Sequence, residues 1–336
     1  MTTQHTTTRT VKREAPHYDA PSAGMRDYAV FGGRLRSEIE FPELVCSPCE
    51  QPDWTFRVAP RRPPVTGVEP VGERRFGSEY YRLSRTDAGF RLEYSHAGTF
   101  DISADGATIV WYRRDGAQLE LVRAIVLGSA LALALELTGL LCLHGSAVVI
   151  RNRAIAFLGP KHYGKSTLAT ALTAAGARLL GDDLLAVQPG PPATLRPGVA
   201  GVRLWSDAAR ALAVETLCDT VIEGVKTTAA GFGGVVHALR DLPLAAVYVL
   251  EPMRAGESNG SVERERLSAV AAAVALAHQT KLPDSLIGLR AAALQLAAAV
   301  ATAGTVPVWK LRMVRDFGLL PTAVKRILQW HEEEQW

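Results

Sequence analysis

The chain has 336 residues, enough for two domains or one large one, and 48% of them are hydrophobic, so it can bury a substantial core. Its formal net charge of +3 reflects 37 Lys and Arg against 34 Asp and Glu. Because the basic residues do not gather on one helical face, the sequence predicts no nucleic-acid partner.

Residues 1–26 are polar and rich in Thr, which is typical of a disordered tail, and they lack the apolar stretch of a signal peptide. The one candidate membrane span, residues 124–143, contains Glu136 and Gly139, and its uninterrupted apolar run is shorter than the ~18 residues that a span needs. Four cysteines in a chain of this length fit a reducing compartment. We therefore expect a cytoplasmic protein with no membrane partner.

Residues 27–116 contain short runs that alternate apolar and polar residues, for example 54–58 and 90–94, separated by turn sequences rich in Gly and Asp. This pattern predicts hairpins, and hence a small antiparallel, β-rich N-terminal module. Within it, Cys46 and Cys49 form a C-x-x-C motif, which can be a redox pair or half of a zinc site. No second pair and no His cluster accompany it, which favours a loop pair without a role.

Residues 117–336 contain both helical and strand patterns. Residues 118–140 predict a long apolar helix that joins or packs the two parts, and two short runs, 177–180 and 184–187, predict a hairpin-like pair. Further strands are predicted at 142–150, 154–158, 202–205, 244–250 and 306–313, and further helices at 168–175, 207–212, 266–278, 283–303 and 321–330.

A phosphate-binding loop of the form G-x-x-x-x-G-K-[ST] lies between the strand at 154–158 and the helix at 168–175. A strand, a Gly-bounded loop and a helix N-terminus are the context in which backbone N–H groups can surround phosphate oxygens. Lys165 would reach the outer phosphates, and the Ser166 hydroxyl would coordinate Mg²⁺. The candidate nucleotide-binding residues are Gly159, His162, Tyr163, Gly164, Lys165, Ser166 and Thr167.

Three ionisable residues flank this loop. His144 precedes it, and the pair Asp182 and Asp183 follows it. We expect the strand after the loop helix to return beside the loop's own strand and to bring the Asp pair near the phosphates. One carboxylate could then coordinate Mg²⁺, and the other could accept a proton from an attacking hydroxyl, with a His to hold that base. An ordinary Asp-Asp turn and a structural His on an apolar strand are the alternatives.

The order and spacing of these motifs resemble the catalytic domain of HPr kinase/phosphorylase, over about residues 140–330. The resemblance implies an α/β P-loop domain of the type shared with phosphoenolpyruvate carboxykinase, ATP and Mg²⁺ as cofactors, and phosphate transfer to a serine hydroxyl. It also implies a role for each residue: Asp182 as the base, His144 as its partner, Lys165 as the phosphate clamp, and Ser166 and Asp183 on the metal side.

The chain departs from that family in three places, the first of which is the loop interior at 160–163, which is bulkier and more basic than the family's. Residues 197–205, after the Asp pair, have no carboxylate where the family has a metal-binding Glu, and residues 27–116 do not match the family's N-terminal domain. The chain is more similar to the divergent HPr-kinase-like proteins of peptide natural-product clusters, including lasso-peptide clusters, some of which phosphorylate a serine of a precursor peptide.

The predicted function is therefore an ATP- and Mg²⁺-dependent kinase whose partner is a peptide or protein substrate with a serine. Arg203 and Lys226 are candidates for contact with phosphate, the second from a polar lid; a surface Arg and a solvated loop Lys are the alternatives. A small-molecule kinase and a non-catalytic nucleotide-binding module are competing functions. The acceptor and a homo-oligomeric state stay open.

Overall fold

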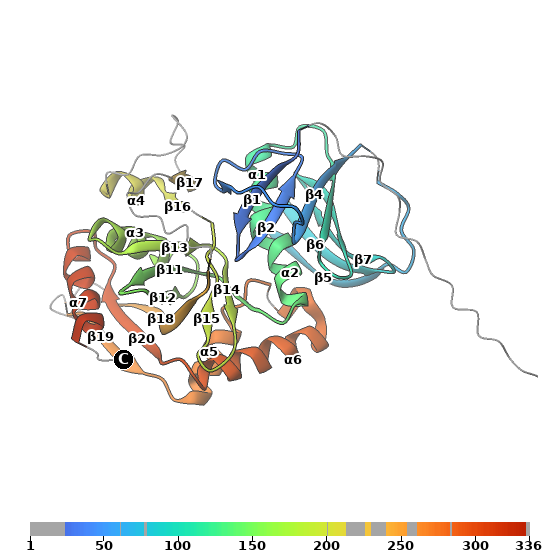
Figure 1. Cartoon of the computed structure of the whole chain (residues 1–336). Coiled ribbons are helices and arrows are strands. Elements are labelled where there is room, and N and C mark those ends of the chain that lie inside the picture. The colour runs from blue at the N-terminus through green and yellow to red at the C-terminus, as the bar shows by residue number, and fades with distance from the viewer. Residues whose placement is uncertain are drawn as a thin grey trace, which may run out of the picture.

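The computed structural model of the chain describes residues 24–60, 62–76, 79–199, 201–212, 226–229, 240–253, 261–282 and 284–333. These residues form a mixed α/β structure, as predicted, with two nine-stranded sheets and one two-stranded sheet. Figure 1 shows the two large sheets side by side, with α2 (Leu131–Leu137) between them. Among the described residues, no helix combines the length and apolarity needed to cross a membrane.

The first sheet occupies the segment for which hairpins were predicted. Its strands run in the order β3-β1-β2-β4-β9-β8-β7-β6-β5, and β5 to β9 follow one another as antiparallel neighbours. The expectation of a purely antiparallel module was wrong, because β4 pairs in parallel with both β2 and β9. The strands are β1 Arg26–Val30, β2 Gly33–Ser37, β3 Val45–Cys46, β4 Trp54–Ala59, β5 Glu69–Phe76, β6 Glu79–Thr86, β7 Gly89–Tyr94, β8 Gly98–Ser103 and β9 Thr108–Arg113.

A continuous helical segment covers this sheet. It consists of α1 (Leu119–Ile125), the π-helix η1 (Val126–Ala130) and α2 (Leu131–Leu137). Its buried side chains belong to the same hydrophobic core as those of the first sheet, for example Phe100 and Trp111. The sequence-based boundary at residues 116 and 117 puts this helix with the second part, whereas its packing puts it with the first.

The second sheet runs in the order β10-β14-β15-β18-β12-β11-β13, with β20 beside β18 and β19 beside β20. The predicted hairpin at 177–187 is wrong, because β13 pairs with β11, and β14 pairs with β10 and β15. The strands are β10 Leu141–Leu143, β11 Gly145–Ile150, β12 Arg153–Leu158, β13 Arg178–Asp182, β14 Leu185–Gln188, β15 Thr194–Leu195, β18 Leu242–Met253, β19 Glu263–Arg266 and β20 Val308–Val314.

The direction of three strands brings the site together. β11 lies between β12 and β13 and is antiparallel to both, so β12 and β13 run the same way. The expectation that the strand after the loop helix lies beside the loop's own strand was therefore wrong. Nevertheless, the phosphate loop after β12 and the Asp pair at the end of β13 reach the same edge of the sheet, and β11 begins at that edge.

Helices cover both faces of the second sheet. Alternate residues of β12 point to opposite faces, so Phe157 packs with α3 (Lys165–Ala174) and α7 (Leu320–Glu333), whereas its two neighbours pack with α5 (Ala269–Ala277) and α6 (Asp284–Ala303). The helix predicted at 266–278 begins later than expected, because β19 extends to Arg266 and the Ser268 side chain caps α5 by accepting a hydrogen bond from Ala271 N.

A small two-stranded sheet lies next to α3 (Figure 1). It pairs β16 (Val202–Trp205) with β17 (Lys226–Ala229) in antiparallel register, and the short helix α4 (Ser206–Ala211) follows β16 directly.

Candidate functional site

The phosphate loop joins the end of β12 to the start of α3, as predicted. Gly159 and Gly164 have φ angles of 141° and 87°, which side chains disfavour. At Gly159 an added Cβ would also lie 3.3 Å from the Leu250 carbonyl oxygen, so the loop leaves little room there for any other residue. Sequence and local geometry therefore agree on a loop shaped by its two glycines.

Lys165 folds back across this loop. Its side chain is buried, and its Nζ donates hydrogen bonds to the carbonyl oxygens of Gly159, at 2.7 Å, and Pro160, at 3.1 Å. The start of the loop is fixed from the other side, because Gly159 N donates to the side-chain oxygen of Gln279 at 3.2 Å. The ammonium group is thus held at the loop, where a phosphate chain would lie.

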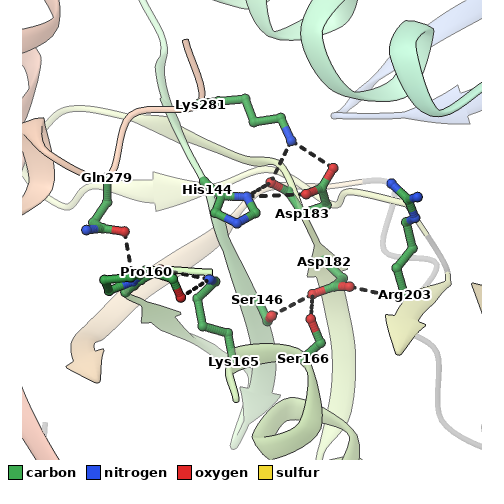
Figure 2. A network of polar contacts seen from close by, with 11 residues as sticks. His144, Ser146, Pro160, Lys165, Ser166, Asp182, Asp183, Arg203, Gln279 and Lys281 are labelled. Carbon is green, nitrogen blue, oxygen red and sulfur yellow. Dashed lines mark hydrogen bonds and ion pairs between the residues drawn. The ribbon is translucent and has the colours of Figure 1, made fainter. Parts of the chain in front are cut away.

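Asp182 is buried and faces the start of α3. Its Oδ1 accepts hydrogen bonds from Ser166 Oγ at 2.9 Å and from Ser146 Oγ at 2.5 Å, and its Oδ2 accepts one from the backbone N of Arg203 at 2.9 Å (Figure 2). Both carboxylate oxygens are therefore engaged. The contact with Ser166 gives the two oxygen donors that a P-loop enzyme uses to hold a magnesium ion.

Asp183 faces the other way, toward His144 and Lys281. Its Oδ2 lies 2.7 Å from Lys281 Nζ, and its Oδ1 lies 3.2 Å from His144 Nδ1 (Figure 2). Burial alone would raise the pKa of the Asp183 carboxyl, but these two neighbours hold that pKa well below its usual range. The sequence predicted His144 as the partner of Asp182; the structure pairs it with Asp183.

His144 lies outside the strand that was predicted for it. It separates β10 from β11, and its backbone N donates to the carbonyl oxygen of Gln279 at 2.7 Å. Its Nδ1 is also 3.1 Å from the carbonyl oxygen of Asp183. Both neighbours of Nδ1 are acceptors, so Nδ1 carries the hydrogen, and Nε2 of the neutral ring is left as an acceptor.

A cavity of about 590 Å³ opens over the phosphate loop. His144 lines it from between β10 and β11, Lys165 and Ser166 line it from the start of α3, and β16, α4 and the segment after β20 close its other side. The ring of His162 stacks on Trp205 of β16 at 4.8 Å, so β16 is packed against the loop interior. Further residues that line the cavity are Tyr163, Thr167, Arg203, Arg210, Arg315 and Phe317.

The donor set around Ser166 fits magnesium. Mg²⁺ prefers oxygen ligands and is commonly bound by one or two carboxylates together with substrate phosphates and water. Ser166 and Asp182 supply a hydroxyl and a carboxylate beside the loop, and the described residues include no group of three or more His, Cys, Asp or Glu that could hold a metal by themselves.

The two cysteines of the C-x-x-C motif, Cys46 and Cys49, are free thiols, and burial raises the pKa of Cys49.

The predicted residues whose side chains are described thus come together in one region. Arg203 contributes its backbone N to Asp182, and its side chain lines the cavity. The side chain of Lys226 falls outside the described residues, and its backbone pairs with Trp205. Sequence reasoning missed Ser146, Gln279 and Lys281. Lys281 is 98 residues from Asp183, and no motif marks it.

Comparison with known proteins adds little to this site. No family model matches the chain, and no curated protein matches it. Among solved structures, the Hpr(Ser) kinase/phosphatase from Coxiella burnetii is similar to it over 57% of this chain and 99% of that chain, with 16% sequence identity and a TM-score of 0.29. A similarity at this level carries no function across, so any function has to follow from the chemistry of the site.

Proposed function

We propose that the protein is an ATP- and Mg²⁺-dependent kinase of the P-loop type that transfers the γ-phosphoryl group to a hydroxyl, most naturally a serine of a peptide or protein. The observation that carries this proposal is the hydrogen bond between Ser166 of the phosphate loop and Asp182, with the His144–Asp183 pair at the same edge of the sheet. A bare phosphate-binding loop would need no second carboxylate and no imidazole.

The loop supports the donor half of the reaction. The N-terminus of α3 and the Gly-bounded backbone offer N–H groups and a positive dipole end to the phosphates. Lys165 Nζ, now bonded to two loop carbonyls, would exchange them for phosphate oxygens. Ser166 and Asp182 would hold Mg²⁺, which neutralises charge on the phosphates when it is bound.

The His144–Asp183 pair supports the acceptor half. The acceptor oxygen forms a bond to the γ-phosphorus, the bond from that phosphorus to the bridging oxygen breaks, and ADP leaves with the bonding electrons. The hydroxyl proton needs an acceptor, and Nε2 of His144 is available because Nδ1 is committed to Asp183. The ionised Asp183 stabilises the imidazolium that results.

This assignment differs from the one the resemblance implies, in which Asp182 is the base. Asp182 already accepts three hydrogen bonds, so it favours a metal-side role. The catalytic residues of the proposal are Lys165 and His144, and Asp183 orients His144.

The test is incubation of the purified protein with γ-radiolabelled ATP and Mg²⁺, with and without cell extract. We expect ATP binding, slow hydrolysis, and label on a peptide or protein. Lys165→Ala should abolish turnover, whereas Lys325→Ala, on the exposed face of α7, should not. Label on a metabolite would favour a small-molecule kinase. Binding without any turnover would favour a nucleotide-binding module, and a wild-type protein that fails to bind MgATP would refute the proposal.

A further inference from the structure

The first part of the molecule reaches the candidate reaction centre through its π-helix, η1. A Cβ added to Gly128 in this helix would lie 3.6 Å from the Cε and Nζ atoms of Lys281 and 3.7 Å from Asp183 Oδ2. The bare backbone of Gly128, which is buried, therefore packs directly against the Lys281–Asp183 ion pair. A wider turn of this kind is rare in helices and occurs often at functional sites.

The position of the π-helix is fixed by the first sheet. The Tyr94 hydroxyl, from β7, donates a hydrogen bond to Ser129 Oγ at 2.8 Å, one residue from Gly128. Tyr94 is itself held by a stacked contact with Tyr81 at 5.4 Å and an edge contact with Phe100 at 6.1 Å. The wall that faces the ion pair is thus part of a packed core and not of a loose loop.

Lys281 belongs to the short segment that follows α5, and the contacts of this segment hold it on its other side. Its backbone N donates to the carbonyl oxygen of Cys142 at 2.8 Å. Two residues earlier, Gln279 accepts hydrogen bonds from the backbone N of His144 and from that of Gly159. The short segment 279–281 therefore contacts three parts of the site: the start of the phosphate loop, the backbone of His144 and, through Lys281, the carboxylate of Asp183.

Asp183 needs such support. Its φ angle of 73° is left-handed, a conformation that costs a residue with a side chain of the order of 1 kcal/mol or more. Lys281 Nζ lies 2.7 Å from Asp183 Oδ2 and 3.4 Å from the Asp183 carbonyl oxygen, so it contacts both the side chain and the strained backbone. Asp183 in turn contacts His144.

We propose that Lys281, held in place by Gly128 of the first part, is a positioning residue for phosphoryl transfer: it fixes Asp183, which orients His144. This inference rests on the proposed kinase function. Residue 128 has to be glycine or alanine, because any side chain longer than a methyl group would occupy the space of the Lys281 ammonium. The first part of the chain is then a component of the catalytic site and not an appended module.

The test compares four variants by ATP hydrolysis with water as the acceptor, which needs no identified substrate. Lys281→Met should lower kcat about 10²-fold, the size expected for a misplaced catalytic group, and leave KM for ATP nearly unchanged because the phosphate loop is intact. Lys281→Arg should restore part of kcat. Gly128→Leu should lower kcat like Lys281→Met, and Gly128→Ala, whose Cβ fits at ordinary contact distance, should not.

A double variant and thermal unfolding complete the test. Gly128→Leu combined with Lys281→Met should be no slower than the slower single variant, because both remove the same contact. If the wild type hydrolyses ATP and Lys281→Met keeps its kcat, the inference fails while the proposed function stands. Equal losses of kcat, ATP affinity and melting temperature in all four variants would assign Lys281 a structural role and overturn it. A wild type without turnover would remove both.

Discussion

β13 ends at Asp182, and the chain bends at Asp183, where φ is 73°, so the two carboxylates have different surroundings although they follow one another in the chain. Asp182 faces two serine hydroxyls and a backbone N–H, all neutral donors. Asp183 faces an ammonium group and an imidazole. In the proposed reaction the first carboxylate serves the metal, and the second serves the proton acceptor.

Magnesium titration separates these two roles. Asp182→Asn keeps the size of the side chain but removes the charge beside Ser166, so the Mg²⁺ concentration for half-maximal ATP turnover should rise about 10- to 100-fold. Asp183→Asn should lower kcat and leave that Mg²⁺ concentration nearly unchanged. Initial rates at saturating ATP over a range of Mg²⁺ measure both. The reverse pattern would show that Asp183 is the metal-side carboxylate.

At the scale of elements, α7 is joined to the second sheet by aromatic and cationic side chains. The Arg264 guanidinium, from β19, lies between two rings, 4.4 Å from that of Trp309 and 4.6 Å from that of Trp330. Next to Trp330, His331 is buried, and its Nε2 lies 3.0 Å from the Tyr248 hydroxyl. These contacts place a titratable group inside the seam between helix and sheet.

The stability of this seam should depend on acid. Burial and the nearby Arg264 lower the pKa of His331 from 6.5 to about 4. As pH falls from about 6.5 to about 4, His331 is protonated in the unfolded chain but stays neutral in the folded chain, so the folded protein loses stability. The difference in pKa between the two states corresponds to roughly 3 kcal/mol of unfolding free energy. In urea unfolding at several pH values, His331→Gln should flatten this loss; an unchanged slope would contradict the role of His331.

At the scale of the whole molecule, the core of the first sheet extends into the second part, and the second sheet has two further cores, one on each face. Side chains from the second part, including Cys142, Ala186 and Leu282, are buried in the same cluster as the first sheet and its helices. A backbone hydrogen bond from Phe31 N to the Pro197 carbonyl oxygen, at 2.7 Å, joins the two parts at another point. This continuity explains how the first part can contact the ion pair at the candidate site.

Local features of this architecture are readable from the sequence, and non-local ones are not. The phosphate loop needs a strand, two glycines and a helix within twenty residues, and the closing strand and helix, predicted at 306–313 and 321–330, occur as β20 (Val308–Val314) and α7 (Leu320–Glu333). The pairing of β11 between β12 and β13, by contrast, is decided by tertiary packing. Gly128 and Lys281 carry no motif, since their roles arise from the meeting of distant segments.

The last prediction concerns the contact between α2 and α6, which joins the two parts of the molecule. Glu136 of α2 accepts a hydrogen bond from Gln295 Nε2 of α6 at 3.0 Å. Burial raises the pKa of Glu136 to about 8, and the hydrogen bond from Gln295 opposes this only in part. The unfolded chain loses the Glu136 proton near pH 4.5, so the folded chain should lose stability as pH rises from about 4.5 to about 8.

Glu136→Gln removes this loss, because an amide carries no charge to bury. We expect the variant to be more stable than the wild type at pH 8 by a few kcal/mol, and the two to converge near pH 4.5. The loss of stability caused by His331 occurs below about pH 6.5, so a change in stability between pH 6.5 and 8 can be assigned to Glu136. Urea unfolding of both proteins measures the difference. A variant less stable than the wild type at pH 8 would mean that Glu136 is ionised in the folded protein, and the contact between α2 and α6 would then have to hold a buried charge.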